Sequence, residues 1–530
     1  MSFISDHIEQ HESKSSVPML TLELLPNELL HYVFSYLHSD EIIYSFLNLN
    51  IRFYTLCLPY IERLNLSTTS NVQIISTQNF QLIPSLIKTL KLNDTQLDWV
   101  FDSPDSVPTY FTQLQTIQLR ILLQNEHYKQ YLPVFKKTIS SLLLDYQNAS
   151  LFSKIDHGIL TEFIANDSST ALSTLIIDGV CLSIDSGDFQ ICQTLTRLTL
   201  SVEYQHHLFI LLEYLPQLEY LSIGIREGKA GIYDYNYSKT KDLRLKLRQL
   251  IISANDIDFT DLYLLLRQCQ STLEILKLRF KIDYIIDGRM LEPLKRSLKQ
   301  FYFYFFCHSL DDSSVNADDL LSSFQTSLWL HDQSVMFFTN SFYQTYTIVS
   351  PPYDCKKFNC SLTNEFLNYR LNNRQEKFKM PRIKRIFLND KQQPVYTDRY
   401  FQVLKSIFIN LQIIEIGSNF HLIDNDGNNN SWKEDAKLST VRTLIIVNNQ
   451  DHLNVKRLFK LLPNLYRLII DYDLLVASTY DLYSVERQEQ YQCQQLQEIL
   501  IHFQPNQHIE LDDDFKNRVK LIYGEAKILS

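Results

Sequence analysis

Three segments decide the fold of this chain: LRQLII (residues 247–252), LEILKL (273–278) and LKQFYF (298–303). Each has apolar residues at its first, fourth and sixth positions, and the last two are separated by one residue, as on one face of a short strand. The fourth residues of successive segments lie 26 and 25 residues apart. Because a short strand fills only a small part of that period, the pattern predicts a repeated unit in which a strand alternates with a helix or a loop.

The same pattern recurs along most of the chain. From Leu64 to Phe301 its middle apolar residues are spaced 23 to 33 residues apart. Isolated matches would arise by chance on the order of 20 times in so apolar a chain, so the regular spacing is the evidence for a repeat. The middle residues are Leu64, Leu90, Ile117, Leu142, Leu175, Leu198, Leu221, Leu250, Leu276, Phe301, Ile386, Ile414, Leu444, Leu468 and Ile499.

Helices are predicted between the strands. Residues 260–268 place Leu262, Leu265 and Leu266 on one face, and residues 455–462 form a second such segment, which ends before Pro463. This alternation resembles the leucine-rich repeats of F-box proteins, which implies an α/β solenoid, or horseshoe, of short parallel strands and helices. An α/β domain with evenly spaced strands is the alternative interpretation.

The repeats are irregular and interrupted. In the family's fuller consensus an Asn or Cys follows each strand, and only Asn255 and Asn449 clearly occupy that position. No convincing match appears in residues 304–382. There, residues 327–330 (SLWL) suit a degenerate repeat, whereas residues 336–338 and 346–349 suit a hairpin that ends at two prolines. The sequence leaves both interpretations open.

The amino-terminal segment LELLPNELLHYVFSYL (residues 22–37) has a different pattern. Pro26 suits the first turn of a helix, and Glu28 complements the positive end of the helix dipole. Leu29, Leu30, Val33, Phe34 and Leu37 follow at helical spacing. A second helix is expected from Ser39 or Asp40 to about Leu47, and a third from Asn50, containing Arg52 and Phe53.

These residues resemble an F-box, whose hallmark is Leu-Pro-x-Glu followed by an apolar pair and a Phe-Ser-x-Leu-like ending. The resemblance implies docking to a Skp-type adaptor and, through it, to a cullin. Three such short helices cannot bury all their apolar surface, which suits a partner interface. A simple cap on the repeat array is the alternative. The residues expected to bind the adaptor are Leu25, Pro26, Glu28, Leu29, Leu30, Phe34, Leu37, Leu47 and Phe53.

The predicted domain organisation follows from these patterns. We expect a disordered segment (1–19), an F-box (20–66), a leucine-rich-repeat array (67–303), an irregular insertion or degenerate repeats (304–382), and carboxy-terminal leucine-rich repeats (383–530). Alternate strand residues are expected on the concave surface, where they would meet a protein substrate. The candidate substrate-binding residues are Lys277, Tyr302, Tyr304 and Glu415, beside Lys91, Gln118, Thr199 and Ser222.

Composition narrows the possible functions. The chain of 530 residues has 45% hydrophobic residues, only 10 glycines and a net charge of −10. Phosphate-cradling glycine loops are therefore not expected, and nucleic acid is not expected as a partner. The eight cysteines lack any framework spacing, which indicates reduced thiols. No secretory signal and no membrane span is found, which predicts a cytoplasmic or nuclear protein.

Candidate chemical motifs are weak. The sequence holds no nucleophile, metal or phosphate-loop motif, so we expect no catalytic residues, metal site or cofactor. The pair His206 and His207 is interpreted as solvent-facing. Residues 425–431 (NDGNNNS) mimic a calcium loop but place glycine wrongly. The basic residues of 370–391 are interpreted as a solvated linker.

The sequence thus predicts a non-catalytic substrate receptor of a Skp-cullin-F-box ubiquitin ligase, with an unknown protein substrate. A repeat scaffold without a ligase link is the alternative. A hydrolase with a site hidden in residues 304–382 is a third hypothesis, from a different class.

Overall fold

The computed structural model describes most of the chain as two compact units. Residues 1–153 and 158–180 form the amino-terminal unit, and residues 154–157 and 181–530 form the carboxy-terminal unit. The described residues are 22–67, 83–101, 103–122, 126–147, 154–155, 160, 162–163, 170–184, 189–227, 245–282, 286–308, 320, 322–324, 326, 328–329, 335–340, 345–350, 357–362, 379–389, 396–417, 420, 434–446, 455–485, 496–503, 513–523 and 526–529.

The amino-terminal unit begins with helices and continues as a parallel sheet. Its helices are η1 (Leu22–Leu24), α1 (Asn27–Phe34), α2 (Ser39–Phe46), α3 (Ile51–Ile61), η4 (Pro84–Leu86), η5 (Asp94–Gln96), α4 (Leu97–Val100), α5 (Ser106–Tyr110), η6 (His127–Tyr131) and α6 (Leu132–Thr138). Its strands are β1 (Arg63–Asn65), β2 (Thr89–Asn93), β3 (Thr116–Leu122), β4 (Ser141–Gln147) and β6 (Thr174–Asp178), which pair in chain order.

The described part of the carboxy-terminal unit contains two sheets. In the first, β5 (Lys154–Ile155) pairs with β7 (Cys181–Leu182), and parallel strands follow it in chain order. These strands and their helices are β8 (Arg197–Tyr204), α8 (Gln205–Tyr214), β9 (Tyr220–Glu227), β10 (Gln249–Asn255), α9 (Phe259–Cys269), β11 (Ile275–Ile282), α10 (Gly288–Ser297) and β12 (Gln300–His308).

Among the residues that the structure describes, the second sheet has seven parallel strands, again in chain order. Its elements are β15 (Lys357–Leu362), β16 (Arg385–Leu388), α13 (Asp398–Ile407), β17 (Ile413–Ile416), β18 (Thr443–Ile446), α14 (Val455–Leu461), β19 (Arg467–Asp471), α15 (Tyr472–Val485), β20 (Glu498–His502), α16 (Asp513–Tyr523) and β21 (Lys527–Leu529).

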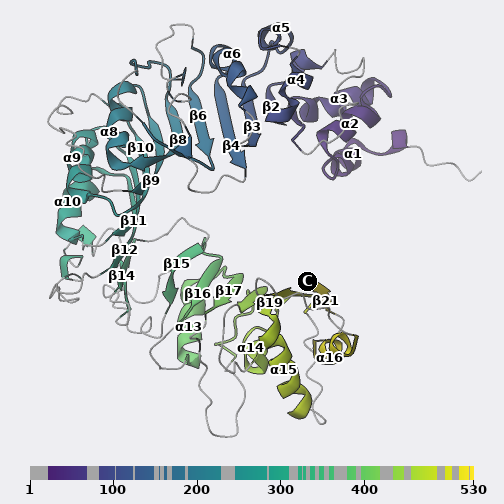
Figure 1. Ribbon diagram of the computed structural model, residues 1–530, viewed down its shortest axis with the longest axis vertical. Helices are drawn as coiled ribbons and strands as arrows, with labels where there is room; N and C mark the ends of the chain where they lie inside the picture. Colours follow the sequence, from purple (N-terminus) through teal and green to yellow (C-terminus); the bar gives the residue numbers. More distant parts are fainter. Residues whose placement is uncertain are drawn as a thin grey trace, which may run out of the picture. The chain divides into compact units, whose positions relative to one another are not determined.

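The predicted repeat is present as a ladder of buried residues. Every middle apolar residue of the pattern lies in a strand. Wherever two of these strands pair with each other, their middle residues lie directly opposite one another, as in Leu221↔Leu250↔Leu276↔Phe301. Leu221, Leu250 and Leu276 have 0% exposure and Phe301 has 1%. Helices α8, α9 and α10 cover this buried face of β8–β12 (Figure 1). The fold is therefore mixed α/β and leucine-rich-repeat-like.

The helices begin and end where local chemistry requires it. Asp258 accepts a hydrogen bond from the amide of Thr260 (2.8 Å) at the start of α9, and Thr397 accepts one from Tyr400 (3.3 Å) at the start of α13. The predicted helices at 260–268 and 455–462 are α9 and α14, confirmed to within one residue at each end. Their apolar residues fill the space beside the strands.

The interruption after β12 contains the hairpin. Strands β13 (Met336–Asn340) and β14 (Thr345–Val349) are antiparallel, and β14 also pairs antiparallel with β12. The alternative of a degenerate repeat strand at 327–330 is wrong. Residues 328–329 are helical, and the fully buried Trp329 packs against Phe301 and Phe303. Strand β15 lies in the same interval and was not predicted, because KFNCSL lacks the apolar spacing.

Truncating one member of the ladder tests its contribution to stability. Leu250→Ala removes a fully buried side chain, and we expect it to lower the free energy of unfolding by about 2–5 kcal/mol. Ile251→Ala, on the other face of the same strand, is the matched control and is expected to cost less than half as much. Urea unfolding followed by circular dichroism measures both. Equal losses would contradict the assigned strand faces.

Candidate docking surface on the amino-terminal helices

The first three helices form a small module with its own apolar centre. Phe34 and Phe53 have 0% exposure, and the ring of Phe46 lies between them, with centroids at 4.9 and 5.7 Å. Burial raises the pKa of the Cys57 thiol to about 11, which indicates an unreactive thiol in this centre. The other buried apolar residues of the module are Leu30, Ile42, Ile43, Leu47, Leu56 and Ile61.

Hydrogen bonds fix the ends of these helices. The amide of His38 donates to Glu41 Oε2 (2.8 Å) at the start of α2. Asn50 Oδ1 accepts from the amide of Phe53 (3.1 Å) at the start of α3, and Asn50 Nδ2 donates to Glu23 Oε1 (3.2 Å). Because the last of these contacts joins residues 27 positions apart, α3 holds the segment before α1 in place.

Arg52 strengthens this connection. Its guanidinium donates to the carbonyl oxygens of Glu23 and Leu25, and to Asn27 Oδ1 at 2.7 and 2.9 Å. A planar guanidinium presents several donors in a fixed fork, so a single side chain can satisfy three acceptors on one segment. Arg52 thereby fixes the Leu25-Pro26 turn against α3. The sequence pattern showed Arg52 only as a basic residue before Phe53.

An exposed apolar stripe lies on the outside of α1. Leu29, Tyr32, Val33 and Tyr36 follow one another at spacings of three, one and three residues, and are 49, 62, 36 and 72% exposed. Residues at this spacing share one side of a helix. The ring of Tyr32 lies edge-on to that of Tyr36 at 5.1 Å, and the Tyr36 hydroxyl donates to the Tyr32 hydroxyl at 2.7 Å. That hydrogen bond, with a smaller effect of burial, raises the pKa of Tyr36.

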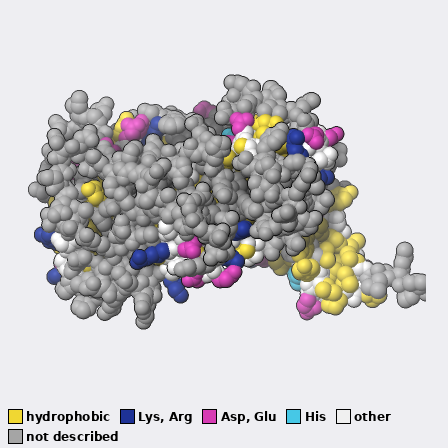
Figure 2. Space-filling model, turned by 90° about the horizontal axis from the view of Figure 1, so that it is seen from below, with side chains coloured by type: hydrophobic (Ala, Val, Ile, Leu, Met, Phe, Trp, Pro, Cys, Tyr) yellow, Lys and Arg dark blue, Asp and Glu magenta, His cyan; other side chains and the backbone are white. Residues whose placement is uncertain are grey.

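Further exposed apolar side chains lie on the same helical module. Among the described residues, ten of the nineteen exposed large hydrophobic side chains lie between Leu22 and Tyr54. Figure 2 shows hydrophobic side chains gathered over this end of the unit. We call this set the α1 surface. Its members are Leu22, Leu24, Leu29, Tyr32, Val33, Tyr36, Tyr44, Leu49, Ile51 and Tyr54.

The predicted adaptor-binding residues differ in their exposure to solvent. Pro26, Glu28 and Leu29 are exposed, and Leu25 and Leu37 are half-buried. The other four, Leu30, Phe34, Leu47 and Phe53, are 0 to 6% exposed and form the centre of the module, so their expected direct contact with a partner is corrected to a supporting role. Tyr32, Tyr36, Tyr44 and Ile51 belong to the α1 surface and are not among the predicted residues.

The predicted substrate-binding residues also differ in their exposure. Lys277 and Tyr302 are directly opposite on β11 and β12, on the face without helices, and Lys277 Nζ lies 5.7 Å from the centre of the Tyr302 ring. Tyr304 was expected beside Tyr302 but is only 3% exposed. It belongs to a buried cluster that includes Val349 on β14, so the hairpin explains the error. Glu415 pairs with Arg385 at 2.8 Å.

Other strand residues expected on the same face are where the pattern placed them. Lys91, Gln118, Thr199 and Ser222 are half-buried and alternate with buried neighbours.

Asn255 is exposed at the end of β10, and the second predicted asparagine, Asn449, lies outside the described residues. So do residues 1–19, the loop at 425–431, and half of the basic segment 370–391. The other half, residues 379–389, includes strand β16, so the interpretation of this segment as a solvated linker is wrong there. In the amino-terminal unit, Asn93 Nδ2 donates to the carbonyl oxygen of Ser67 (3.0 Å), which joins neighbouring turns.

The predicted exposure of His207 is wrong. It was expected to face solvent beside His206, but its side chain is 2% exposed at the start of α8. The amide of Tyr204 lies 3.3 Å from Nδ1 and the amide of Ile184 lies 3.4 Å from Nε2. Burial, and secondarily the charge of His206, lowers the pKa of His207 to about 3. The ring is therefore neutral, and it accepts a backbone hydrogen bond at one nitrogen.

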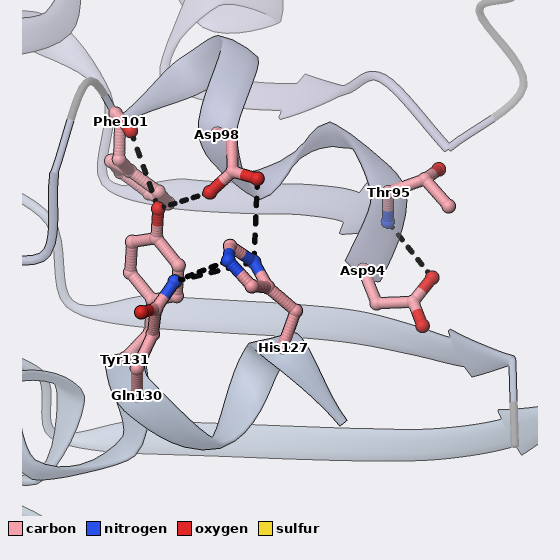
Figure 3. Close-up of polar contacts among 7 residues, drawn as sticks. All are labelled: Asp94, Thr95, Asp98, Phe101, His127, Gln130 and Tyr131. Carbon is pink, nitrogen blue, oxygen red and sulfur yellow. Dashed lines mark hydrogen bonds and ion pairs between the residues drawn. The ribbon is translucent and has the colours of Figure 1, made fainter. Parts of the chain in front are cut away.

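An aspartate and a histidine are paired in the amino-terminal unit. Asp98 on α4 accepts a hydrogen bond from the Tyr131 hydroxyl (2.7 Å) and lies 3.3 Å from His127 Nδ1, and Gln130 also reaches His127 (Figure 3). A catalytic dyad of this kind needs a nucleophile at the histidine. Tyr131 instead donates to the aspartate, and burial and Asp98 raise its pKa. The cluster therefore connects α4 to η6.

Within the described residues, no group of three or more His, Cys, Asp or Glu side chains is arranged to hold a metal ion. Likewise, none of the described helices has the length and hydropathy that a membrane span requires.

Comparison with known proteins adds little. No protein-family model matches the chain, and no curated protein matches it. Among solved structures it is similar to the crystal structure of the TLR13–ssRNA13 complex, at 15% sequence identity and a TM-score of 0.33. The alignment covers 80% of this chain but 51% of that one, so this chain spans about half the length of that protein. The repeat assignment rests on the strand register described above.

Removing the Arg52 side chain tests its role in holding the Leu25-Pro26 turn. Arg52→Ala removes every bond from the guanidinium, so we expect amide hydrogens of residues 22–30 to exchange at least about tenfold faster. Arg63→Ala, at an exposed position, is the control and should leave that exchange unchanged. Unaltered exchange in Arg52→Ala would show that the turn is held by other contacts.

The buried His207 predicts a dependence of stability on pH. Because its folded pKa is lowered, the neutral ring favours the folded state above the unfolded pKa of about 6.5, and this stability is lost as the pH falls toward about 3. His207→Gln keeps an acceptor for the Tyr204 amide but does not titrate. We expect the wild-type melting temperature to fall more than that of the variant between pH 7 and pH 4. Parallel curves would contradict the burial of a neutral ring.

Proposed function

We propose that this chain is the substrate-receptor subunit of a Skp-cullin-F-box ubiquitin ligase, in which the α1 surface docks a Skp-type adaptor and the repeats hold a protein substrate. The observation that carries the proposal is the concentration of exposed apolar side chains on three short helices that begin with Leu25-Pro26-Asn27-Glu28. That sequence is similar to the F-box hallmark, and it stands directly before the repeats.

The α1 surface supports docking on energetic grounds. Burying an exposed leucine or tyrosine side chain of this size contributes about 1.5–3 kcal/mol, so a few anchors suffice for a stable complex. An exposed stripe of Leu29, Tyr32, Val33 and Tyr36 is unfavourable in water unless a partner covers it. A module that only capped the repeat array would turn its apolar side toward β1 and leave a polar outer side.

The rigidity of the module supports the same proposal. Arg52 and Asn50 fix the segment before α1, and the buried Phe34, Phe46 and Phe53 fix the helices against one another. A surface that is ordered before binding loses less conformational entropy when the partner arrives. In this proposal the chain performs no chemistry. It raises the effective concentration of the substrate beside a separate enzyme that carries ubiquitin.

Adaptor binding tests the proposal directly. Full-length chain is titrated with a purified Skp-type adaptor by calorimetry, and the wild type is expected to bind. Leu29→Ala/Tyr32→Ala should weaken binding at least about 100-fold, since truncating two buried anchors costs about 3 kcal/mol or more.

The matched control is Leu264→Ala/Tyr110→Ala, because these two side chains are 53 and 54% exposed on other helices. This control should bind the adaptor as the wild type does, with unchanged circular dichroism. An adaptor that ignores the wild-type chain would reject the proposal and leave a repeat scaffold without a ligase link.

A further inference from the structure

Strands β18 to β21 carry a row of aliphatic side chains on the face that has no helices. Leu444, Leu468 and Ile499 have 0% exposure and belong to one buried cluster with residues of α14 and α15, so the alternate strand residues point the other way. At the next position of each strand, the residues directly opposite one another are Ile445, Ile469, Leu500 and Leu529. We call these four residues the aliphatic row.

The aliphatic row meets solvent. Leu500 is 38% exposed, and Ile445, Ile469 and Leu529 are half-buried. Among the described strands, no other run of more than two aliphatic residues occupies this position. Polar residues hold it on β2, β3, β9 and β11, namely Lys91, Gln118, Ser222 and Lys277. An apolar run on a solvent-facing strand position indicates a surface that a partner covers.

Charged residues border the row on both sides. Toward the strand starts, Arg467, Glu498 and Lys527 are directly opposite one another. Arg467 pairs with Glu498, whereas Lys527 is exposed and forms no ion pair with any residue that the structure describes. Two cations therefore share one carboxylate, which leaves this side positive and suited to a carboxylate of a partner. Toward the strand ends, Asp471 lies 3.0 Å from His502 on the next strand.

The spacing of the row selects the kind of partner. Neighbouring strands lie about 4.8 Å apart, so four residues in a row span about 14 Å. An apolar stripe at positions i, i+3, i+7 and i+10 of an α-helix spans about 15 Å, because each residue rises about 1.5 Å. Four alternate residues of an extended peptide span about 20 Å. A helix therefore matches the row, and an extended peptide lying across the strands does not.

We propose that the aliphatic row binds an amphipathic helix of a partner protein, which lies across β18–β21 with its apolar stripe on the row and acidic side chains toward Lys527. The carboxylates of this helix give Lys527 the kind of partner that Glu498 already gives Arg467. The apolar contacts provide most of the affinity, and the charged side fixes the orientation of the helix about its axis.

This inference gives the proposed substrate receptor a substrate class, and it rests on the proposed function only where the partner is called a substrate. Helix binding is measured on the full chain without an adaptor. Failure of adaptor binding therefore leaves the result on the aliphatic row intact, and failure of helix binding leaves adaptor docking intact.

The probe is a fluorescein-labelled, hydrocarbon-stapled helical peptide with leucines at i, i+3, i+7 and i+10 and glutamates along one side of that stripe, followed by anisotropy. The wild-type chain is expected to bind it at least about tenfold more tightly than a stapled peptide of the same composition with leucines distributed around the helix. Ile469→Thr and Leu500→Thr keep residues that favour strands, and each should weaken binding about tenfold.

The matched control is Ile251→Thr, because Ile251 is a half-buried aliphatic residue on the helix-free face of β10. This variant should bind the peptide as the wild type does. Lys527→Glu tests the charged side of the row. It should weaken binding of the glutamate peptide about tenfold, and it should strengthen binding of a peptide with lysines in place of the glutamates.

Four results would overturn the proposal: no binding of the leucine-stripe helix, equal binding of the redistributed peptide, equal weakening by Ile251→Thr, or tighter binding of an extended peptide with alternate leucines. A dimer of the wild-type chain that Leu500→Thr abolishes in sedimentation would also overturn it, because a second copy of the chain would then occupy the row.

Discussion

The structure depends on one packing constraint, the in-register stacking of apolar residues along parallel strands. A single strand of five residues cannot bury its apolar side alone, but each repeat places Leu, Ile or Phe directly opposite its counterpart in the next. The resulting row, exemplified by Ile414, Leu444 and Leu468 at 0 to 2% exposure, is continuous within each sheet. It fixes the strand faces and so determines which residues meet solvent.

This constraint also explains which parts of the fold could be predicted. The middle residues of the pattern all lie in strands because their spacing is imposed by the repeat itself. Strand β15 lacked that spacing, and Tyr304 is covered by the hairpin that follows it, which no local pattern records. His207 is buried for a similar reason, since the chain at Ile184 contacts its ring.

The exposed residues of the α1 surface were only half predictable. The sequence of α1 has apolar residues on nearly every side, so its spacing predicts a helix but does not orient it. The contacts of Phe34 with Phe46 and Tyr60 decide that Leu30 and Phe34 turn inward. Leu29, Tyr32, Val33 and Tyr36 consequently face solvent. Arg52 then fixes the preceding turn, a role visible only when Glu23, Leu25 and Asn27 are placed beside it.

We propose that the α1 surface binds an adaptor while the strand faces hold a substrate. Hydrogen exchange of the full chain, measured with and without a Skp-type adaptor, tests this proposal most directly. The account predicts slower exchange confined to residues 22–54, with β10 and β11 unchanged. Protection on the strands instead, or no protection in the helical module, would contradict it.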